Sequence, residues 1–127
     1  MDYFSKSKFV RELTPKDFDP RRTWILRRSN CSIILWYAPW CPHCKAVQGV
    51  WEQLGKSATF MDVLSFNCEK YKGYLLKIQE DAPELVRGFP TITFYTGGEP
   101  TEEYRGDRSL GNLLKACMRV CSNGGTF

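Results

Sequence analysis

Two cysteines separated by two residues, Cys41 and Cys44, form the pattern in this sequence that most directly suggests chemistry. They follow Ser32–Ala38, an apolar run of strand length, and precede a segment with helical spacing. Cys41 is therefore expected at a helix N-terminus, where unpaired backbone N–H groups and the helix dipole favour an anion. Such surroundings lower a cysteine pKa. The pattern predicts an attacking thiolate at Cys41 and a resolving thiol at Cys44.

The two residues between the cysteines fit this chemistry. His43, the single histidine of the chain, can place positive charge or a hydrogen-bond donor within reach of the Cys41 sulfur. Pro42 falls in the first helical turn, where its missing N–H costs no hydrogen bond. Because the spacer is short, Cys44 can attack a mixed disulfide on Cys41 and release the substrate. Both spacer residues are therefore expected to tune the thiol pair.

Two other interpretations of the pair remain open, a half zinc site and a structural disulfide. A zinc site needs a second pair of ligands at matching spacing, which Cys31, Cys117 and Cys121 do not supply. The expected helix start favours redox activity over a structural bond. We therefore predict that no metal is bound.

The remaining four cysteines are expected to be inert, because the apolar content of the chain is high enough for folding without disulfides. Cys31 and Cys68 are predicted to be core residues near strand ends. Cys117 and Cys121, four residues apart, share one face of a helix as small buried or half-buried side chains. The alternative for this last pair is a regulatory disulfide with another chain.

The elements that position these residues alternate between strands and helices. Apolar runs predict buried strands, and spacings of three and four residues predict helices. The expected strands lie near Phe9–Leu13, Ser32–Ala38, Phe60–Phe66, Thr91–Tyr95 and Glu102–Tyr104. The expected helices begin after Thr14 or Asp17, begin at the cysteines, cover Tyr74–Val86 with a break at Pro83, and cover Leu110–Val120. This order predicts an α/β fold with a parallel core, helices on both faces and an antiparallel hairpin at one edge.

Two motifs resemble the thioredoxin superfamily, and most closely the catalytic domains of protein disulfide isomerase. The segment WYAPWCPHCK is similar to that family's FYAPWCGHCK, with Pro42 in place of glycine. The segment Gly88–Ile92, GFPTI, is similar to its G-Y-P-T. The resemblance implies a thioredoxin fold, with a central mixed sheet of about five strands flanked by about four helices. It also implies one domain over residues 1–127, with a core from about 9 to 121.

The resemblance further implies roles for residues around the thiols. Pro90 is expected to be cis and to present the backbone of Phe89 to a peptide, and Trp40 is expected on the substrate-facing surface. Arg108 matches an arginine that lowers the pKa of the second cysteine. The family's buried acid and its lysine partner are replaced by Leu35 and Ser65.

These features predict a thiol–disulfide oxidoreductase that needs no cofactor beyond the Cys41–Cys44 disulfide. Stabilising the thiolate makes the disulfide more oxidising, so we expect a potential of about −230 to −120 mV, above that of thioredoxin. This favours an oxidase or isomerase over the first alternative, a thioredoxin-like reductase. The alternative of another class is a redox-inactive module that binds client proteins.

Composition limits the partners. The net charge of +4 is spread along the chain without a dense basic tract, which argues against nucleic-acid binding. No apolar run reaches the roughly 20 residues of a membrane span, and no signal peptide or retention tetrapeptide is recognisable. We therefore expect a monomer in the cytoplasm that acts on cysteine-containing proteins and is recycled by a reductase, an oxidase or glutathione.

Overall fold

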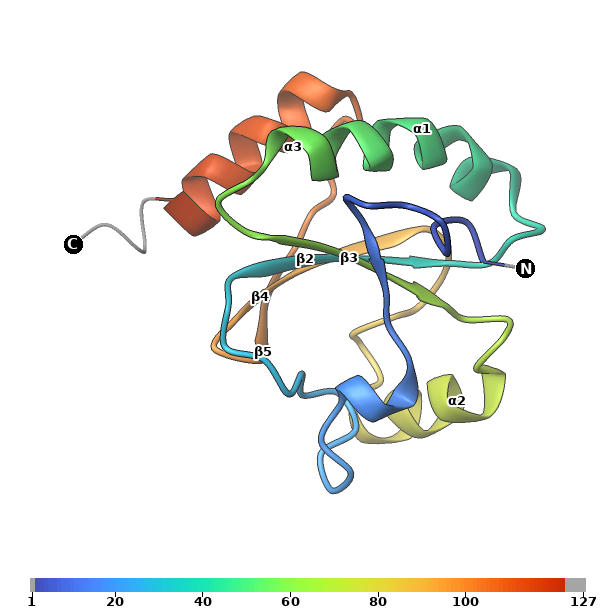
Figure 1. Cartoon of the computed structure of the whole chain (residues 1–127). Coiled ribbons are helices and arrows are strands. Elements are labelled where there is room, and N and C mark those ends of the chain that lie inside the picture. The colour runs from blue at the N-terminus through green and yellow to red at the C-terminus, as the bar shows by residue number, and fades with distance from the viewer. Residues whose placement is uncertain (1, 123–127) are drawn as a thin grey trace.

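The computed structural model describes residues 2–122, so residue 1 and residues 123–127 of the expected 1–127 domain lie outside it. Strands and helices alternate along most of the chain (Figure 1). The strands are β1 (Arg11–Glu12), β2 (Ser32–Tyr37), β3 (Asp62–Asn67), β4 (Thr91–Thr96) and β5 (Glu99–Glu103). The α-helices are α1 (Pro42–Ser57), α2 (Lys72–Asp81) and α3 (Leu110–Cys117), and two short helices are η1 (Pro15–Asp17) and η2 (Met118–Ser122).

The five strands form one mixed sheet in the order β1-β3-β2-β4-β5. β1, β3 and β2 are parallel, whereas β4 pairs antiparallel with both β2 and β5. Every residue of the central strand β2 is buried, which is what an uninterrupted apolar run predicts for a strand covered on both faces. The predicted mixed five-stranded sheet is confirmed.

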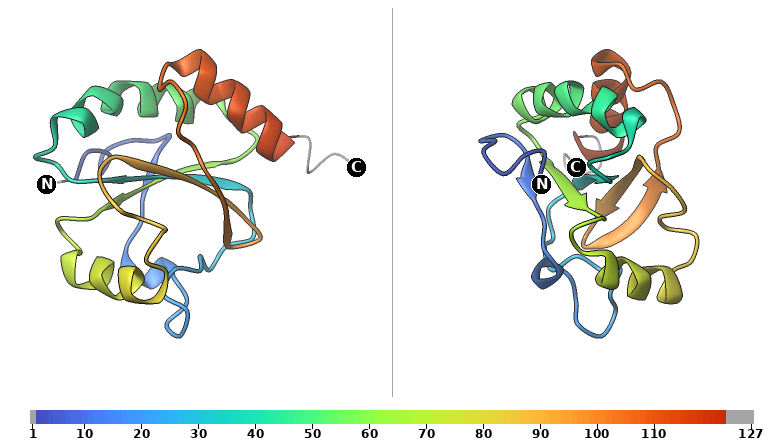
Figure 2. Two further views of the ribbon diagram at one scale, coloured as in Figure 1. Left: turned by 180° about the vertical axis from the view of Figure 1, so that it is seen from behind. Right: turned by 90° about the vertical axis from the view of Figure 1, so that its right-hand side faces the viewer.

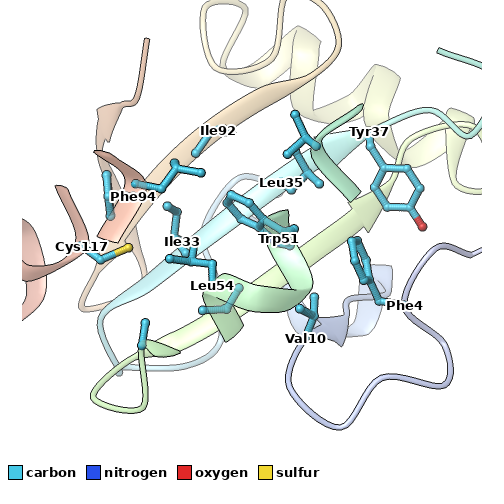
Figure 3. Packing of buried hydrophobic residues seen from close by; sticks show 14 of the residues in the cluster. Phe4, Val10, Ile33, Leu35, Tyr37, Trp51, Leu54, Ile92, Phe94 and Cys117 are labelled. Atoms are coloured by element: carbon cyan, nitrogen blue, oxygen red, sulfur yellow. The ribbon is translucent and has the colours of Figure 1, made fainter. Parts of the chain in front are cut away.

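Helices cover both faces of the sheet. In Figures 1 and 2, α1 and α3 lie over one face and α2 lies under the other. Trp51 of α1 is fully buried against the sheet, and its indole N–H donates to the Leu64 carbonyl at 2.9 Å. Figure 3 shows Trp51 between Leu35 and Leu54 on the α1 side. The core thus consists of two apolar layers, one on each side of the sheet.

The β4–β5 hairpin turns on two glycines with positive φ, Gly97 at 61° and Gly98 at 87°. Only glycine adopts this conformation without steric cost, and two such residues in a row are typical of a tight hairpin. A Cβ on Gly98 would lie 2.6 Å from the Leu26 carbonyl oxygen. The TGGEP segment therefore forms the predicted hairpin, and β5 begins earlier than expected, at Glu99.

Two of the expected helices are shorter than predicted. After β1 the chain forms only the 3₁₀ turn Pro15–Asp17, capped by Thr14, whose side chain accepts from the Lys16 N–H. The described chain thus has three α-helices rather than about four. The helix α2 ends at Asp81, two residues before Pro83, because proline cannot donate within a helix and disfavours it in the residues before.

One prediction about the cysteines is wrong. Cys31 and Cys121 are joined by a disulfide that spans 90 residues of sequence. The bond ties the loop before β2 to η2, a π-helical turn that directly follows α3. The spacing of Cys117 and Cys121 indicates only that they share one face of the last helix, whereas the fold brings that helix over the sheet and Cys121 beside Cys31. Cys68 and Cys117 are buried free thiols, as expected.

Candidate active site

Cys41 is the N-cap of α1, and Pro42 follows it in the first turn. The backbone N–H of Cys41 donates to the Ala38 carbonyl at 3.0 Å, so the loop after β2 makes a tight turn before the helix starts. Cys41 is 7% exposed and Cys44 is fully buried, one turn into the helix. Both are free thiols in the structure. Only the first sulfur is therefore open to an incoming disulfide.

The two thiols differ in how readily they ionise. Burial opposes ionisation of Cys41, but the backbone N–H groups of Cys44 and His43, the Cys44 thiol and the Arg108 charge together hold the Cys41 pKa below its ordinary value. Burial raises the pKa of the Cys44 thiol well above its ordinary value, and the charge of Cys41 adds to this. The site is thus built for one thiolate, on Cys41.

A cis peptide bond joins Phe89 to Pro90, as the resemblance implied. The Cys41 thiol donates to the Phe89 carbonyl, with a distance of 3.6 Å between sulfur and oxygen. The Thr91 hydroxyl donates to the Gly88 carbonyl at 2.6 Å and holds the loop before β4 in place. The backbone around Phe89 therefore lies directly beside the more exposed thiol.

Trp40 projects from the loop before α1 and is 60% exposed. Its ring packs edge-on against Phe89, with 6.2 Å between ring centroids, and its indole N–H donates to a Glu69 carboxylate oxygen at 3.1 Å. A large exposed aromatic side chain held in one orientation suits contact with a polypeptide. Trp40 and Phe89 form an apolar surface next to Cys41.

His43 and Arg108 reach the thiols by different means. His43 acts on Cys41 through its backbone N–H, and His43 as a residue is exposed. Arg108 lowers the pKa of both cysteines through its charge. The structure therefore brings the predicted site residues together around Cys41, with His43 acting through its position in the helix.

Across the sheet, the paired positions on β2 and β3 that correspond to the family's buried acid and lysine carry no charged residue. Leu35 and Ser65 are both fully buried and lie opposite each other on β2 and β3. On β1, Glu12 lies opposite Ser65. Burial raises the pKa of Glu12, although the Tyr37 hydroxyl donates to its carboxylate at 2.6 Å. A carboxylate is thus present on this sheet, two strands away from the position where the family carries its acid.

Sequence reasoning missed three residues near the site, Tyr3, Glu12 and Tyr37. Strand alternation places Tyr37 on the same face as Leu35, which was a usable signal. Tyr3 and Glu12 carried none, because their approach to Tyr37 depends on the path of the chain before β1.

Residues 2–122 contain neither a candidate membrane span nor a candidate metal site. No helix among residues 2–122 is long and apolar enough to cross a bilayer. Over the same residues no three or more His, Cys, Asp or Glu side chains gather in a way that could hold a metal ion.

The sequence is similar to those of known proteins. Residues 9–119 match the family model described as "Thioredoxin". The chain is 28% identical to protein disulfide-isomerase like 2-2 of Arabidopsis thaliana, over 91% of this chain and 24% of that protein. It is 31% identical to protein disulfide-isomerase erp38 of Neurospora crassa, over 82% of this chain and 27% of that protein. The chain thus spans about a quarter of the length of these relatives.

Solved structures show the same fold. The J-Trx1 fragment of ERdj5 superposes with a TM-score of 0.75 at 19% identity, covering 92% of this chain and 54% of that one. The Trx4 domain of ERdj5 superposes with a TM-score of 0.70 at 17% identity, covering 94% and 98%. The predicted fold is therefore confirmed.

Proposed function

The chain belongs to the thioredoxin family, and we propose that it is a thiol–disulfide oxidoreductase that acts as an oxidase or isomerase through Cys41 and Cys44. Similarity to protein disulfide isomerases supports the general activity. The observation that carries the proposal is the contrast between the thiols: backbone N–H groups and Arg108 favour the Cys41 thiolate, while burial keeps Cys44 protonated.

The reaction proceeds by two exchanges. The Cys41 thiolate attacks one sulfur of a substrate disulfide, a Cys41–substrate bond forms, and the other substrate sulfur leaves as a thiolate. Cys44 then attacks the Cys41 sulfur and the bond between Cys41 and the substrate breaks. The substrate sulfur that was bonded to Cys41 departs with the Cys44 proton. The substrate is reduced and the Cys41–Cys44 pair is oxidised. Run in reverse, the same steps oxidise a substrate dithiol.

The favoured direction of exchange follows from the stability of the Cys41 thiolate. Contacts that stabilise the Cys41 thiolate stabilise the reduced pair, and this makes the disulfide a stronger oxidant. We therefore place the potential in the interval of about −230 to −120 mV. A slow second exchange, with Cys44 buried and protonated, leaves time for another substrate thiol to attack the mixed disulfide. That alternative attack is the isomerase reaction.

The substrates on this proposal are cysteine-containing polypeptides. The Phe89 backbone beside Cys41 and the exposed Trp40 ring offer a peptide both polar and apolar contacts. A reductase, an oxidase or glutathione completes each cycle. If this domain is part of a longer protein, we propose the same activity and the same kinds of partner for that protein.

A trapping experiment tests the function. With Cys44 replaced by serine, Cys41 should form a stable mixed disulfide with a protein that contains an accessible disulfide, and dithiothreitol should reverse it. Cys41→Ser should form none. If neither the parent nor Cys44→Ser exchanges disulfides while client binding persists, the redox-inactive binding module is the correct interpretation.

The compartment is a separate proposal. The sequence predicted the cytoplasm, whereas a disulfide between Cys31 and Cys121 supports an oxidising compartment, because cytosolic thiols are kept reduced. We propose the oxidising compartment. Acid quenching of cells followed by alkylation and peptide mass spectrometry should find Cys31 and Cys121 protected until reduction. Finding both alkylated without reduction would restore the cytoplasmic prediction.

A further inference from the structure

The segment Asp2–Phe4, which we term the strap, is fixed to the thiol end of the sheet at both of its ends. The Asp2 carboxylate accepts from the Asn67 side chain at 3.0 Å and pairs with the Lys70 ammonium at 3.0 Å. The Phe4 N–H donates to the Glu12 carboxylate at 2.9 Å, and the Phe4 ring is buried. Figure 1 shows this segment beside the loop between β2 and α1.

Tyr3, in the middle of the strap, spans the thiol pair. Its hydroxyl donates to the carbonyl of Pro39, two residues before Cys41, at 3.1 Å. Its carbonyl accepts from the side chain of Gln48, one helical turn after Cys44, at 3.5 Å. The strap therefore contacts the chain on both sides of the two cysteines.

Tyr37 holds the strap from below. The Tyr3 and Tyr37 rings stack with 4.3 Å between centroids and 16° between planes. The Tyr37 hydroxyl accepts from the Tyr3 N–H at 2.9 Å and donates to Glu12 at 2.6 Å. Figure 3 shows Tyr37 and Phe4 next to each other at this end of the core. The Tyr3 backbone and ring are thus both set by a buried side chain.

The Tyr3 side chain packs against the buried cluster that contains both thiols. Burial raises the Tyr3 pKa, and negative charge on Cys44 and on Cys41 raises it further. The Tyr3 ring thus belongs to the apolar surroundings of the cluster that holds the thiols. Burial in an apolar environment disfavours a thiolate, so a ring placed over Cys44 would favour its protonated form.

We propose that Tyr3 is a positioning residue for the second exchange: held by Tyr37 and Pro39, its ring covers Cys44 and limits how fast this thiol attacks the mixed disulfide. The proposal rests on the proposed function. In the step it controls, the Cys41–Cys44 bond forms, the bond from Cys41 to the substrate breaks, and the Cys44 proton passes to the departing substrate sulfur. A covered Cys44 prolongs the mixed disulfide and so favours isomerisation.

Alkylation of Cys44 tests the proposal. In the Cys41→Ser background, the rate of Cys44 modification by iodoacetamide is followed over a pH series by peptide mass spectrometry, which separates Cys44 from Cys68 and Cys117. Tyr3→Ala should raise the rate at neutral pH about tenfold, the change expected for a pKa lower by about one unit. The midpoint of the pH profile should fall accordingly. Tyr3→Phe keeps the ring, loses the bond to Pro39, and should give a smaller increase.

Phe9→Ala is the matched control, since Phe9 is an exposed aromatic residue of the same N-terminal region that packs near Lys56, at the other end of α1. It should leave Cys44 alkylation unchanged. An unchanged rate and pH profile in Tyr3→Ala, with native circular dichroism, would overturn the proposal, as would an equal increase in Phe9→Ala. Equilibration of the parent protein with glutathione separates a failure of the Tyr3 proposal from a failure of the proposed function. If the Cys41–Cys44 couple is reversible and Tyr3→Ala has no effect, only the Tyr3 proposal is wrong. If there is no reversible couple, the proposed function is wrong as well.

Discussion

The strand β2 has a cysteine pair near each of its ends, and the two pairs differ in almost every physical respect. Cys31 directly precedes the strand and is bonded to Cys121. Cys41 follows the strand as the N-cap of α1 and remains a free thiol beside Cys44. The first pair is a bond between residues 90 positions apart in the sequence, whereas the second consists of two free thiols within one helical turn. One end of the sheet is stapled and the other is reactive.

The difference shows that backbone placement decides what a cysteine pair does. At the reactive end, N–H groups of the first helical turn point at the Cys41 sulfur and favour its thiolate. At the stapled end, the bond constrains the unfolded chain over a long interval, which is where a disulfide stabilises most. Exchange and stability are thus assigned to opposite ends of β2 and should be separable by mutation.

The largest effect is expected at the reactive end. Cys41→Ser should reduce disulfide exchange with a protein substrate to the uncatalysed background, because Cys44 is fully buried and cannot start the reaction. The measurement is the turnover of a disulfide-containing protein in glutathione buffer. Cys117→Ala, which removes a buried free thiol on α3, is the control and should retain turnover. Equal losses in both variants would contradict the assignment.

The second effect belongs to the stapled end. Replacing Cys31 and Cys121 together by serine should lower the free energy of unfolding by about 2–5 kcal/mol, the usual cost of losing a native disulfide. Urea denaturation measures this change. Disulfide exchange per folded molecule should stay at the parent level, because the bond and the thiols lie at opposite ends of β2. A loss of exchange with no loss of stability would reverse the roles of the two ends.

A smaller effect is expected for Arg108→Gln. The Arg108 charge lowers the pKa of Cys41, so its removal should raise that pKa and slow the first exchange at neutral pH. Because Arg108 is exposed, water screens its charge and the change should stay below about tenfold. The rate of Cys41 alkylation against pH measures it. Arg105→Gln is the control, since Arg105 pairs with Glu103 at 3.0 Å. A thiolate profile identical in all three proteins would remove Arg108 from the site.

The smallest effect concerns Glu12 of β1, whose carboxylate accepts from the Tyr37 hydroxyl. Burial of Glu12 raises its pKa in the folded state, so between the ordinary and the raised value the native protein binds more protons than the unfolded one. Stability from this group is therefore present at acidic pH and lost as pH rises through the raised pKa. Glu12→Gln should flatten that dependence, measured by urea denaturation across mildly acidic to neutral pH. Parallel pH curves for the two proteins would show that the carboxyl group is not buried in this way.

The reactive end of the molecule was predictable from sequence, and the reason is local. A buried strand, two cysteines and a helix occur within one short stretch, so Cys41 had to fall at a helix N-terminus. The cis peptide before Pro90 came from resemblance to a family motif, since spacing alone does not indicate it.

The stapled end and the strap were not predictable for the opposite reason. Cys31 and Cys121 meet only after α3 has packed over the sheet. Tyr3 meets Tyr37 only because the chain before β1 returns to the thiol end. Contacts between distant segments depend on the completed fold, and no periodicity within either segment reports them.

A single redox titration tests the contrast between the two ends of β2 most directly. The protein is equilibrated in buffers of increasing reducing strength, quenched in acid and alkylated, and each cysteine is counted by peptide mass spectrometry. This contrast predicts that Cys41 and Cys44 titrate together at about −230 to −120 mV, while Cys31 and Cys121 stay bonded until below about −300 mV. A thioredoxin-like potential of about −270 mV for Cys41 and Cys44, or reduction of both pairs in one step, would contradict it.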